Sequence, residues 1–314
     1  MDPFSVFVPR LVPDEEKLVG GHRACIGCGE ALAVRHVLKA VDRNIIVVNA
    51  TGCIEIFTSA LPQTSWTMPW IHTIFENTAA VASGVEVALR VLKRKGRARD
   101  RRVNVLAFAG DGGTNDIGLQ ALSGALERGH DLLYCCFDNE AYMNTGIQRS
   151  SATPYGAATT TSPPGRLSIG QVSWKKNMPE IAVAHNIPYV ATGCPSYPFD
   201  LIEKVKKGVA APGPAYIHIL SQCPTGWRHP PDMTIKSGRL AVESTIFPLY
   251  EVENGRYSIT VDPPVVRPVR EYLDIQGRFR HLTEEEKDFI QEKVAQDWEK
   301  LRQKASANGA DEGS

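Results

Sequence analysis

Short apolar segments alternate along the chain with stretches in which apolar residues recur every three or four positions. The apolar segments are short and rich in β-branched and aromatic residues, which predicts buried strands at residues 45–48, 103–109, 132–137, 189–191 and 215–220. Helical spacing predicts helices at residues 31–40, 74–93, from near 116, around 181–185 and at 201–209. This alternation predicts an α/β fold with one doubly wound, mostly parallel sheet.

The last third of the chain follows a different pattern. Asn254 and Gly255 lie between two β-like runs, which predicts a hairpin over residues 250–259. Prolines at 263, 264 and 268 predict an extended arm, and a capping box at residues 283–286 predicts a final amphipathic helix. We therefore expect an N-terminal extension (1–20), an α/β domain (21–225), a hairpin, arm and helix (226–304) and a disordered tail (305–314). The C-terminal hairpin, arm and helix would grip a partner subunit or pack on the chain's own domain.

Polar and glycine residues follow two of the predicted strands at the point where each strand ends. The run Gly110-Asp111-Gly112-Gly113 follows one, and Asn139 closely follows the next. Open α/β sheets bind ligands at the carboxyl ends of their strands. Glycines let the backbone approach a phosphate, and Asp and Asn oxygens are ligands that Mg²⁺ prefers. The pattern indicates a magnesium-diphosphate site, although an ordinary strand–helix turn would also contain these residue types.

Four cysteines also lie at turns and strand ends. Cys25 and Cys28 form a Cys-x-x-Cys, and Cys53 and Cys223 each follow a predicted strand. Thiolates converging from loops suit a [4Fe-4S] cluster or a structural Zn²⁺, and Cys-x-x-Cys also suits a thiol–disulfide pair. Cys53 and Cys223 would otherwise be buried apolar residues. The remaining three are Cys135 and Cys136, expected in the core, and Cys194, to which we assign no role.

The net charge and the lack of signal-peptide and membrane-spanning patterns argue against several classes of protein. Lys+Arg and Asp+Glu both total 35, so the net charge gives no argument for nucleic acid or an anionic membrane as partner. Residues 1–20 combine prolines with acidic residues, unlike a signal peptide, and no apolar run is long enough to span a bilayer. We expect a soluble cytoplasmic protein, in which cysteines are metal ligands, redox groups or core residues rather than disulfides.

Taken together, the motifs resemble those of a known enzyme family. The run Gly110-Asp111-Gly112 is followed by Asn139 with 26 residues between Gly112 and Asn139, and this pattern resembles the thiamine diphosphate motif. The wider match, over roughly residues 18–260, is to the β subunits of 2-oxoacid:ferredoxin oxidoreductases, such as the pyruvate and oxalate enzymes. The segments that carry the resemblance are residues 22–30, 49–53, 110–118, 138–148 and 223–227.

The resemblance implies a set of cofactor ligands. Cys25, Cys28, Cys53 and Cys223 would bind a [4Fe-4S] cluster. Mg²⁺ would be bound by the side chains of Asp111 and Asn139 and by the backbone carbonyl of Ala141. Asn144 would lie near the substrate and the thiazolium ring as a catalytic residue. The residues expected around thiamine diphosphate are Glu30, Thr51, Gly52, Cys53, Gly110, Asp111, Gly112, Gly113, Asn139, Ala141, Asn144 and Thr145.

The resemblance also implies an activity and partners. The reaction would be oxidative decarboxylation of a small 2-oxoacid, with one-electron transfer through the cluster to an external ferredoxin. In this family an α subunit supplies the aminopyrimidine-binding half and its Glu, so Glu76 is not assigned that role. A ferredoxin-like cluster subunit is also implied, since this chain lacks a Cys-x-x-Cys-x-x-Cys run, and coenzyme A commonly accepts the acyl group. The chain alone would be inactive.

Two other hypotheses remain at this stage. One is a non-oxidative thiamine-dependent 2-oxoacid decarboxylase subunit with a structural zinc. The other is a binding or electron-transfer subunit without catalytic thiamine, against which the presence of both Asp111 and Asn139 argues. Pyruvate is the expected substrate and oxalate the next. Asn115, if it lay near the pocket, would suit a small polar acid such as oxalate.

Overall fold

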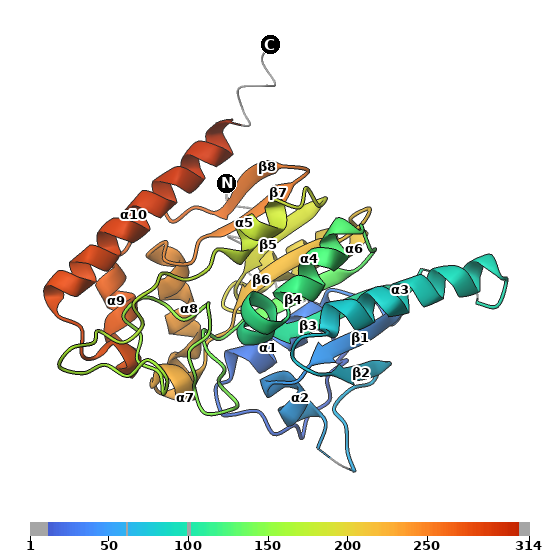
Figure 1. Ribbon diagram of the computed structural model, residues 1–314, viewed down its shortest axis with the longest axis horizontal. Coiled ribbons are helices and arrows are strands. Elements are labelled where there is room, and N and C mark those ends of the chain that lie inside the picture. The colour runs from blue at the N-terminus through green and yellow to red at the C-terminus, as the bar shows by residue number, and fades with distance from the viewer. Residues whose placement is uncertain (1–11, 61, 99–101, 308–314) are drawn as a thin grey trace.

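The computed structural model describes residues 12–60, 62–98 and 102–307, and most of the expected tail, 308–314, lies outside the described residues. Its centre is an eight-stranded sheet in the order β2-β1-β3-β4-β6-β5-β7-β8 (Figure 1). The strands are β1 (Ile45–Ala50), β2 (Trp70–Thr73), β3 (Asn104–Gly110), β4 (Leu133–Asp138), β5 (Tyr189–Gly193), β6 (Ala215–Leu220), β7 (Leu249–Glu253) and β8 (Arg256–Val261). The first six strands in this order, β2 to β5, run parallel, and β7 and β8 are antiparallel.

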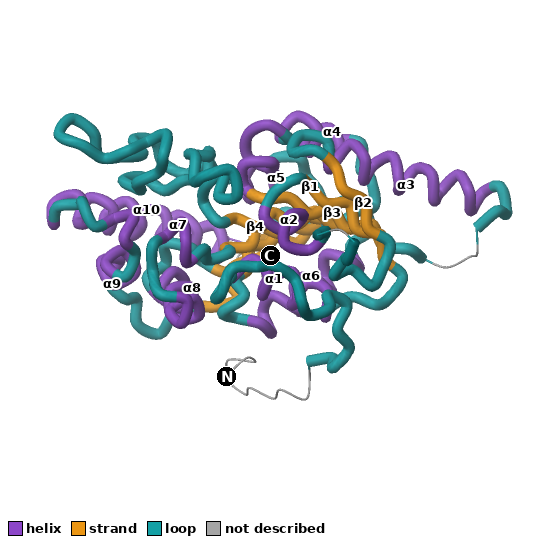
Figure 2. The backbone as a smooth tube through the Cα atoms, turned by 90° about the horizontal axis from the view of Figure 1, so that it is seen from below, coloured by secondary structure: helices purple, strands orange, loops and turns teal. Residues whose placement is uncertain are grey.

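Helices cover both faces of the sheet, so the predicted doubly wound architecture is confirmed. Figure 2 shows α3 (Thr78–Arg94), α4 (Leu119–Glu127) and α5 (Met178–Val183) on one face, with α1 (Gly29–Lys39) and α6 (Pro198–Ala210) on the other. Cys135 packs with the core under α1 and α6, and Cys136 with the core under α3 and α4. Successive side chains of a strand point to opposite faces, so each of these two cysteines is buried in a different core, as expected for core cysteines.

The C-terminal part continues the same sheet across the expected boundary at residue 225. β7 pairs with β5 through Val190 and Val252, and the hairpin turns at Asn254 into β8. The long helix α10 (Glu284–Ala307) runs beside β8 in Figure 1, and its Trp298 and Leu301 enter the core that contains α3 and α4. The hairpin and helix that were predicted therefore pack on the chain's own sheet.

Shorter helical elements, between the strands and after β8, complete the fold. They are α2 (Cys53–Thr58), α7 (Pro224–Trp227), α8 (Thr234–Glu243), α9 (Val269–Asp274) and turns at Gly112–Ile117, Pro231–Met233 and Gly277–Phe279. A third core around Trp227 and Phe279 joins α8, α9 and α10. No helix in the described ranges is both long and apolar enough to cross a membrane.

The sheet topology decides where a ligand can bind. From β1 the chain passes to β2 on one side of it and then to β3 on the other side. The strand order therefore reverses between β1 and β3. In register, Gly110 at the end of β3 lies opposite Phe137 near the end of β4. The carboxyl ends of these parallel strands share one edge, and ligands bind in open α/β sheets at such a reversal.

Candidate active site

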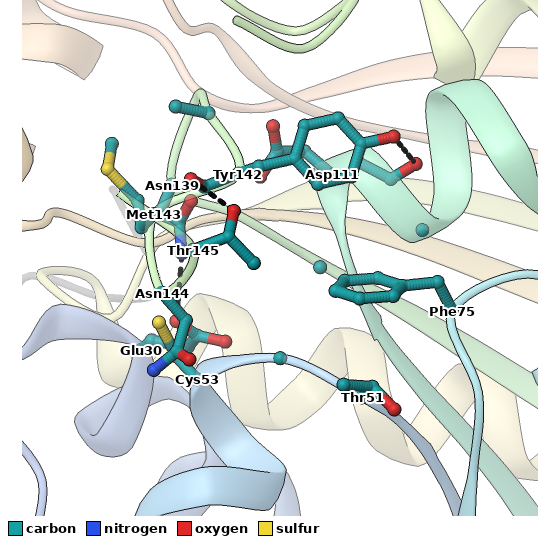
Figure 3. Close-up of a pocket in the computed structure, with 15 residues that line it drawn as sticks. Glu30, Thr51, Cys53, Phe75, Asp111, Asn139, Tyr142, Met143, Asn144 and Thr145 are labelled. Carbon is teal, nitrogen blue, oxygen red and sulfur yellow. Dashed lines mark hydrogen bonds between the residues drawn. The ribbon is translucent and has the colours of Figure 1, made fainter. Parts of the chain in front are cut away.

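A cavity opens at this edge of the sheet. The residues that line it lie at or after the ends of β1, β2, β3 and β4, together with the start of α1. They are Glu30, Thr51, Gly52, Cys53, Phe75, Gly110, Asp111, Gly112, Gly113, Asn139, Ala141, Tyr142, Met143, Asn144 and Thr145. The structure thus brings together every residue that was expected around the cofactor. Figure 3 shows Asp111 and Tyr142 at one end of the cavity, and Glu30, Cys53 and Asn144 at the other.

Asp111 is the buried carboxylate of the site. It is 1 % exposed, follows β3 directly and accepts a hydrogen bond from Ser150 Oγ on Oδ2. Burial, together with the charge of Asp138, raises the pKa of Asp111 well above its usual value. A bound divalent cation would supply the positive charge that stabilises the ionised carboxylate here.

Asn139 lies across the strand pair from Asp111. Its Nδ2 donates to Glu30 Oε2 at 2.9 Å, and its backbone carbonyl accepts from Trp227 Nε1 at 2.8 Å. Its Oδ1 is buried and has no hydrogen-bond partner within the described residues. An oxygen left free in this way suits a hard cation such as Mg²⁺. The donor set, one carboxylate with amide and carbonyl oxygens, fits the expected magnesium site.

The glycines after β3 are constrained by close packing. A Cβ on Gly112 would lie 2.2 Å from the Tyr142 ring, and one on Gly113 would lie 3.1 Å from the Phe75 carbonyl. Tyr142 also donates from its hydroxyl to the Gly112 carbonyl at 3.0 Å. The helical backbone begins at Gly112 in a π-helical turn, rather than near Asp116 as expected. The backbone amides of a helix start therefore lie within the glycine run, where a phosphate was expected.

Three of the four cysteines lie at helix starts. Cys28 caps α1, with its Sγ accepting from Ala31 N at 3.4 Å, and Cys223 Sγ accepts from Gly226 N at 3.3 Å. Cys53 is the first residue of α2. Cys25 is exposed and lies in the turn that precedes α1. Burial raises the pKa of Cys53, and the charges of Glu30, Cys223, Cys28 and Cys25 raise it further. The backbone hydrogen bond from Gly29 N to the Gln222 carbonyl, 2.9 Å, brings the start of α1 beside the residue before Cys223, and Cys53 lines the cavity.

These thiols need a positive partner to ionise. Burial, and then the charge of Glu30, raises the pKa of Cys28 to about 12, and burial raises the pKa of Cys223 to about 11. In the described part of the chain, no group of three or more His, Cys, Asp or Glu side chains is placed so that it could hold a metal ion. Amide donors at the two sulfurs favour thiolates, and iron or zinc would supply the remaining stabilisation.

Glu30 joins the two ends of the site. It is 3 % exposed, lines the cavity and accepts the hydrogen bond from Asn139. Burial raises the pKa of Glu30 to about 7, and the hydrogen bond from Asn139 opposes that rise. The charge of Glu30 also reaches Cys28, Cys53 and Cys223. The same carboxyl group therefore affects both the expected magnesium ligand and the expected cluster ligands.

Some lining residues were missed, and one residue that was considered for the pocket lies outside it. Tyr142 and Met143 lie inside a segment that carries the resemblance, so the motif itself was the available signal. Phe75 enters from the turn after β2 and has no such signal. Asn115 does not line the cavity; it is fully buried, and its side-chain amide has no partner among the described residues. Glu76 is also absent from the lining.

A close backbone contact at Gly29 provides a stability prediction. Gly29 N donates to the Gln222 carbonyl at 2.9 Å, and a Cβ on Gly29 would lie 2.7 Å from Gln222 N. Gly29→Ala should lower the free energy of unfolding by about 1–3 kcal/mol because the neighbouring backbone must move. Urea titration of the purified chain measures this.

Gly84→Ala is the matched control, since no described atom lies within 4 Å of a Cβ at that position in α3. It should leave the free energy of unfolding unchanged or raise it by up to about 1 kcal/mol. Equal stability of Gly29→Ala and the wild type would contradict the close approach of α1 to residue 222.

Comparisons with known proteins agree with this geometry. Residues 50–219 match the family described as thiamine pyrophosphate enzyme, C-terminal TPP binding domain. The pyruvate synthase subunit PorB of Methanocaldococcus jannaschii is 57% identical over 283 residues, which cover 90% of this chain and 95% of that protein. The ketoisovalerate oxidoreductase subunit VorB of Pyrococcus abyssi is 48% identical over 300 residues, covering 95% and 96%.

A solved structure supports the fold. It is the 2-oxoglutarate:ferredoxin oxidoreductase from Magnetococcus marinus with 2-oxoglutarate, coenzyme A and succinyl-CoA bound, which matches with a TM-score of 0.53. It is 21% identical, and the match covers 75% of this chain and 81% of that one. On the sequence relatives and the matched domain, the chain belongs to the β subunits of the 2-oxoacid:ferredoxin oxidoreductases and carries their thiamine diphosphate-binding domain.

Proposed function

We propose that this chain binds Mg²⁺-thiamine diphosphate and a [4Fe-4S] cluster side by side, and that with its partner subunits it oxidatively decarboxylates a 2-oxoacid and reduces ferredoxin. One observation carries the proposal. Asp111 and Asn139, which suit the metal, and Cys53, which suits the cluster, line the same cavity (Figure 3). Two sites that share a wall allow electron transfer without a long path between them.

The magnesium-diphosphate half would be held at the ends of β3 and β4. Asp111 would ligate the ion through its carboxylate, Asn139 through the buried Oδ1 and Ala141 through its carbonyl. Backbone amides at the start of the Gly112–Ile117 turn would bind phosphate oxygens. Bound thiamine diphosphate would supply the electron sink for loss of CO₂, and the protein contributes position and electrostatics.

The cluster half would be held by Cys25, Cys28, Cys53 and Cys223. Amide donors to the sulfurs of Cys28 and Cys223 offset part of the negative charge that a cluster with four thiolates carries. Since Cys53 also lines the cofactor cavity, a cluster at this position would lie next to the reacting centre and accept electrons one at a time.

Asn144 is the residue that we assign to the substrate. It lines the end of the cavity that also contains Glu30 and Cys53, and its amide can donate a hydrogen bond to a carboxylate or a developing oxyanion (Figure 3). Glu30 would fix the orientation of the Asn139 amide through their hydrogen bond. These roles use groups that this chain already positions.

Pyruvate is the substrate we propose, because a pyruvate synthase subunit is 57% identical to this chain. Ketoisovalerate, named for a relative at 48% identity, is an alternative. Oxalate stays in the proposal as a test substrate, although Asn115, which would have suited oxalate from a place near the pocket, does not line the cavity.

Partner subunits would complete the site. Ile26, in the turn between Cys25 and Cys28, is 83% exposed, and Ile74 and Ile117 beside the cavity residues are also exposed. Exposed apolar side chains next to a site suit a covering subunit, here an α subunit that brings the aminopyrimidine-binding half and its Glu. A ferredoxin-like cluster subunit, external ferredoxin and coenzyme A complete the proposed set. A cytoplasmic location agrees with seven free cysteines.

The test is a steady-state assay on the complex purified anaerobically with its partner subunits. Ferredoxin reduction would be followed with pyruvate, 2-oxoisovalerate, 2-oxoglutarate or oxalate, with and without coenzyme A. We expect reduction with pyruvate at the highest kcat/KM. Release of CO₂ without ferredoxin reduction, from a complex that contains zinc and no iron, would instead support the non-oxidative decarboxylase.

A further inference from the structure

A buried ion chain connects the C-terminal part of the protein to the loop after β4. Arg278 lies in the turn Gly277–Phe279 and is 2% exposed. Its guanidinium forms an ion pair with Glu140 Oε2 and donates through Nε to Gln276 Oε1 at 2.9 Å. The same guanidinium lies over the Trp227 ring, 4.2 Å from the ring centroid. One buried cation thus contacts two residues that are far from it in the sequence.

Both of those residues hold the backbone around Asn139. Glu140 is the next residue along the chain, and Trp227 Nε1 donates to the Asn139 carbonyl at 2.8 Å. The second carboxylate oxygen of Glu140 accepts from Lys175 Nζ at 2.9 Å. Arg278 therefore reaches Asn139 by two routes, one through the Glu140 side chain and one through the Trp227 ring.

The backbone at Glu140 needs such support. Its φ is +71°, in the left-handed region that residues other than glycine seldom adopt. Conformations of this kind persist where the surroundings fix them. Without Arg278, one oxygen of a buried carboxylate would lose its cation, and the Trp227 ring would lose the group that covers it.

We propose that Arg278 is a positioning residue for the magnesium loop: acting through Glu140 and Trp227, it holds the Asn139 side chain and the Ala141 carbonyl in the orientation that binds the ion. This inference rests on the proposed function, since it concerns the same Mg²⁺ ligands. Arg278 is absent from the residues that line the cavity, so its effect is exerted through its neighbours.

The test is cofactor binding by the Arg278→Met variant within the purified complex. After removal of Mg²⁺ and thiamine diphosphate with a chelator, Mg²⁺ would be titrated at saturating thiamine diphosphate and followed by calorimetry. We expect the dissociation constant for Mg²⁺ to rise by about 10- to 100-fold, as when outer-shell partners of metal ligands are lost. Activity that is lost at limiting Mg²⁺ should recover as Mg²⁺ is raised to saturation, because excess ion offsets weakened binding by mass action.

Lys204→Met is the matched control. Lys204 forms an equally buried ion pair with Asp200 in α6, with Nζ and Oδ2 2.7 Å apart, and neither residue lines the cavity. Its loss should lower the melting temperature of the complex as Arg278→Met does, but leave Mg²⁺ binding unchanged. Arg278→Lys keeps the charge and should bind Mg²⁺ with intermediate affinity. This variant provides the test if Arg278→Met does not fold.

The outcomes separate the two claims. Wild-type Mg²⁺ affinity in Arg278→Met or Arg278→Lys, with a lowered melting temperature like that of Lys204→Met, would overturn the positioning role and leave the proposed function standing. A wild-type complex that binds no Mg²⁺-thiamine diphosphate would overturn both. Weakened binding in the Arg278 variants alone supports the proposal.

Discussion

Replacing Asp111 with asparagine is expected to weaken binding of Mg²⁺-thiamine diphosphate by more than about 100-fold, beyond the loss seen when outer-shell partners of a metal ligand are removed. Asp111 is the one carboxylate in the ligand set that we propose, and Mg²⁺ depends on carboxylate charge in sites of this kind. Decarboxylation should fall with the bound cofactor. Gel filtration of the complex followed by thiamine and magnesium analysis measures the retained cofactor.

Stability separates this effect from misfolding. Burial and the charge of Asp138 raise the pKa of Asp111, so an ionised carboxylate at this position is costly in the cofactor-free protein. Asp111→Asn should therefore leave the cofactor-free complex at least as stable as the wild type. Cofactor retention in the variant would rule out Asp111 as a ligand.

Asp116→Asn is the matched control for Asp111→Asn. Asp116 accepts from Ser151 N at 3.0 Å and does not line the cavity. We expect this variant to keep its thiamine diphosphate through gel filtration. An equal loss of cofactor in both variants would mean that the effect is not specific to the proposed ligand.

The second large effect is expected at Cys223. Cys223→Ser should remove the absorbance of the cluster in this chain and reduce ferredoxin reduction to background, because a hydroxyl is a poor replacement for a thiolate iron ligand. Thiamine diphosphate should still bind, since Cys223 does not line the cofactor cavity. Iron and sulfide analysis of the isolated chain, reconstituted anaerobically, gives the measurement.

Cys194→Ser is the matched control for the cluster ligand. Cys194 is fully buried, and its sulfur accepts a hydrogen bond from Gln222 Nε2 at 3.3 Å, so a hydroxyl can replace it with the same partner. The control should bind as much iron as the wild type. Iron retained in Cys223→Ser, or lost equally in both variants, would argue against the assigned ligand set.

The local pattern of the sequence was enough to place the central strands and the site residues that follow them. Strands buried on both faces are continuous apolar runs, and β3, β4 and β6 are all of this kind. Polar residues directly after such runs must lie at one edge of a parallel sheet. This is why local signals placed Asp111 and Asn139 at one edge of the sheet, whereas their assignment as the ligands of Mg²⁺ came from the resemblance.

Elements that depend on packing were missed. β2 is a four-residue strand with two exposed residues, in a stretch with prolines and tryptophans, and it exists because it pairs with β1. α2 has six residues and no side-chain cap, so its sequence gives no start signal. The helical turn that starts at Gly112 includes residues of low helix propensity, which local rules place in a loop.

Contacts between residues far apart in the chain could also not be predicted from the sequence. Arg278 and Glu140 are 138 positions apart, and neither carries a motif that pairs them. The same holds for Trp227 and the Asn139 carbonyl, which are 88 positions apart. Asn115 shows the converse, since its proximity to the glycine run suggested a place in the pocket, whereas the π-helical turn keeps its side chain out of the cavity lining.

The central claim, that a thiamine site and an iron–sulfur cluster share one cavity wall at Cys53, is tested most directly by electron paramagnetic resonance. The anaerobic complex would be mixed with pyruvate in the absence of ferredoxin, frozen, and measured with iron and zinc content determined on the same sample. The account predicts a reduced-cluster or thiamine-radical signal that is lost in Asp111→Asn and in Cys223→Ser. A complex that contains zinc, releases CO₂ and gives no paramagnetic signal would contradict it.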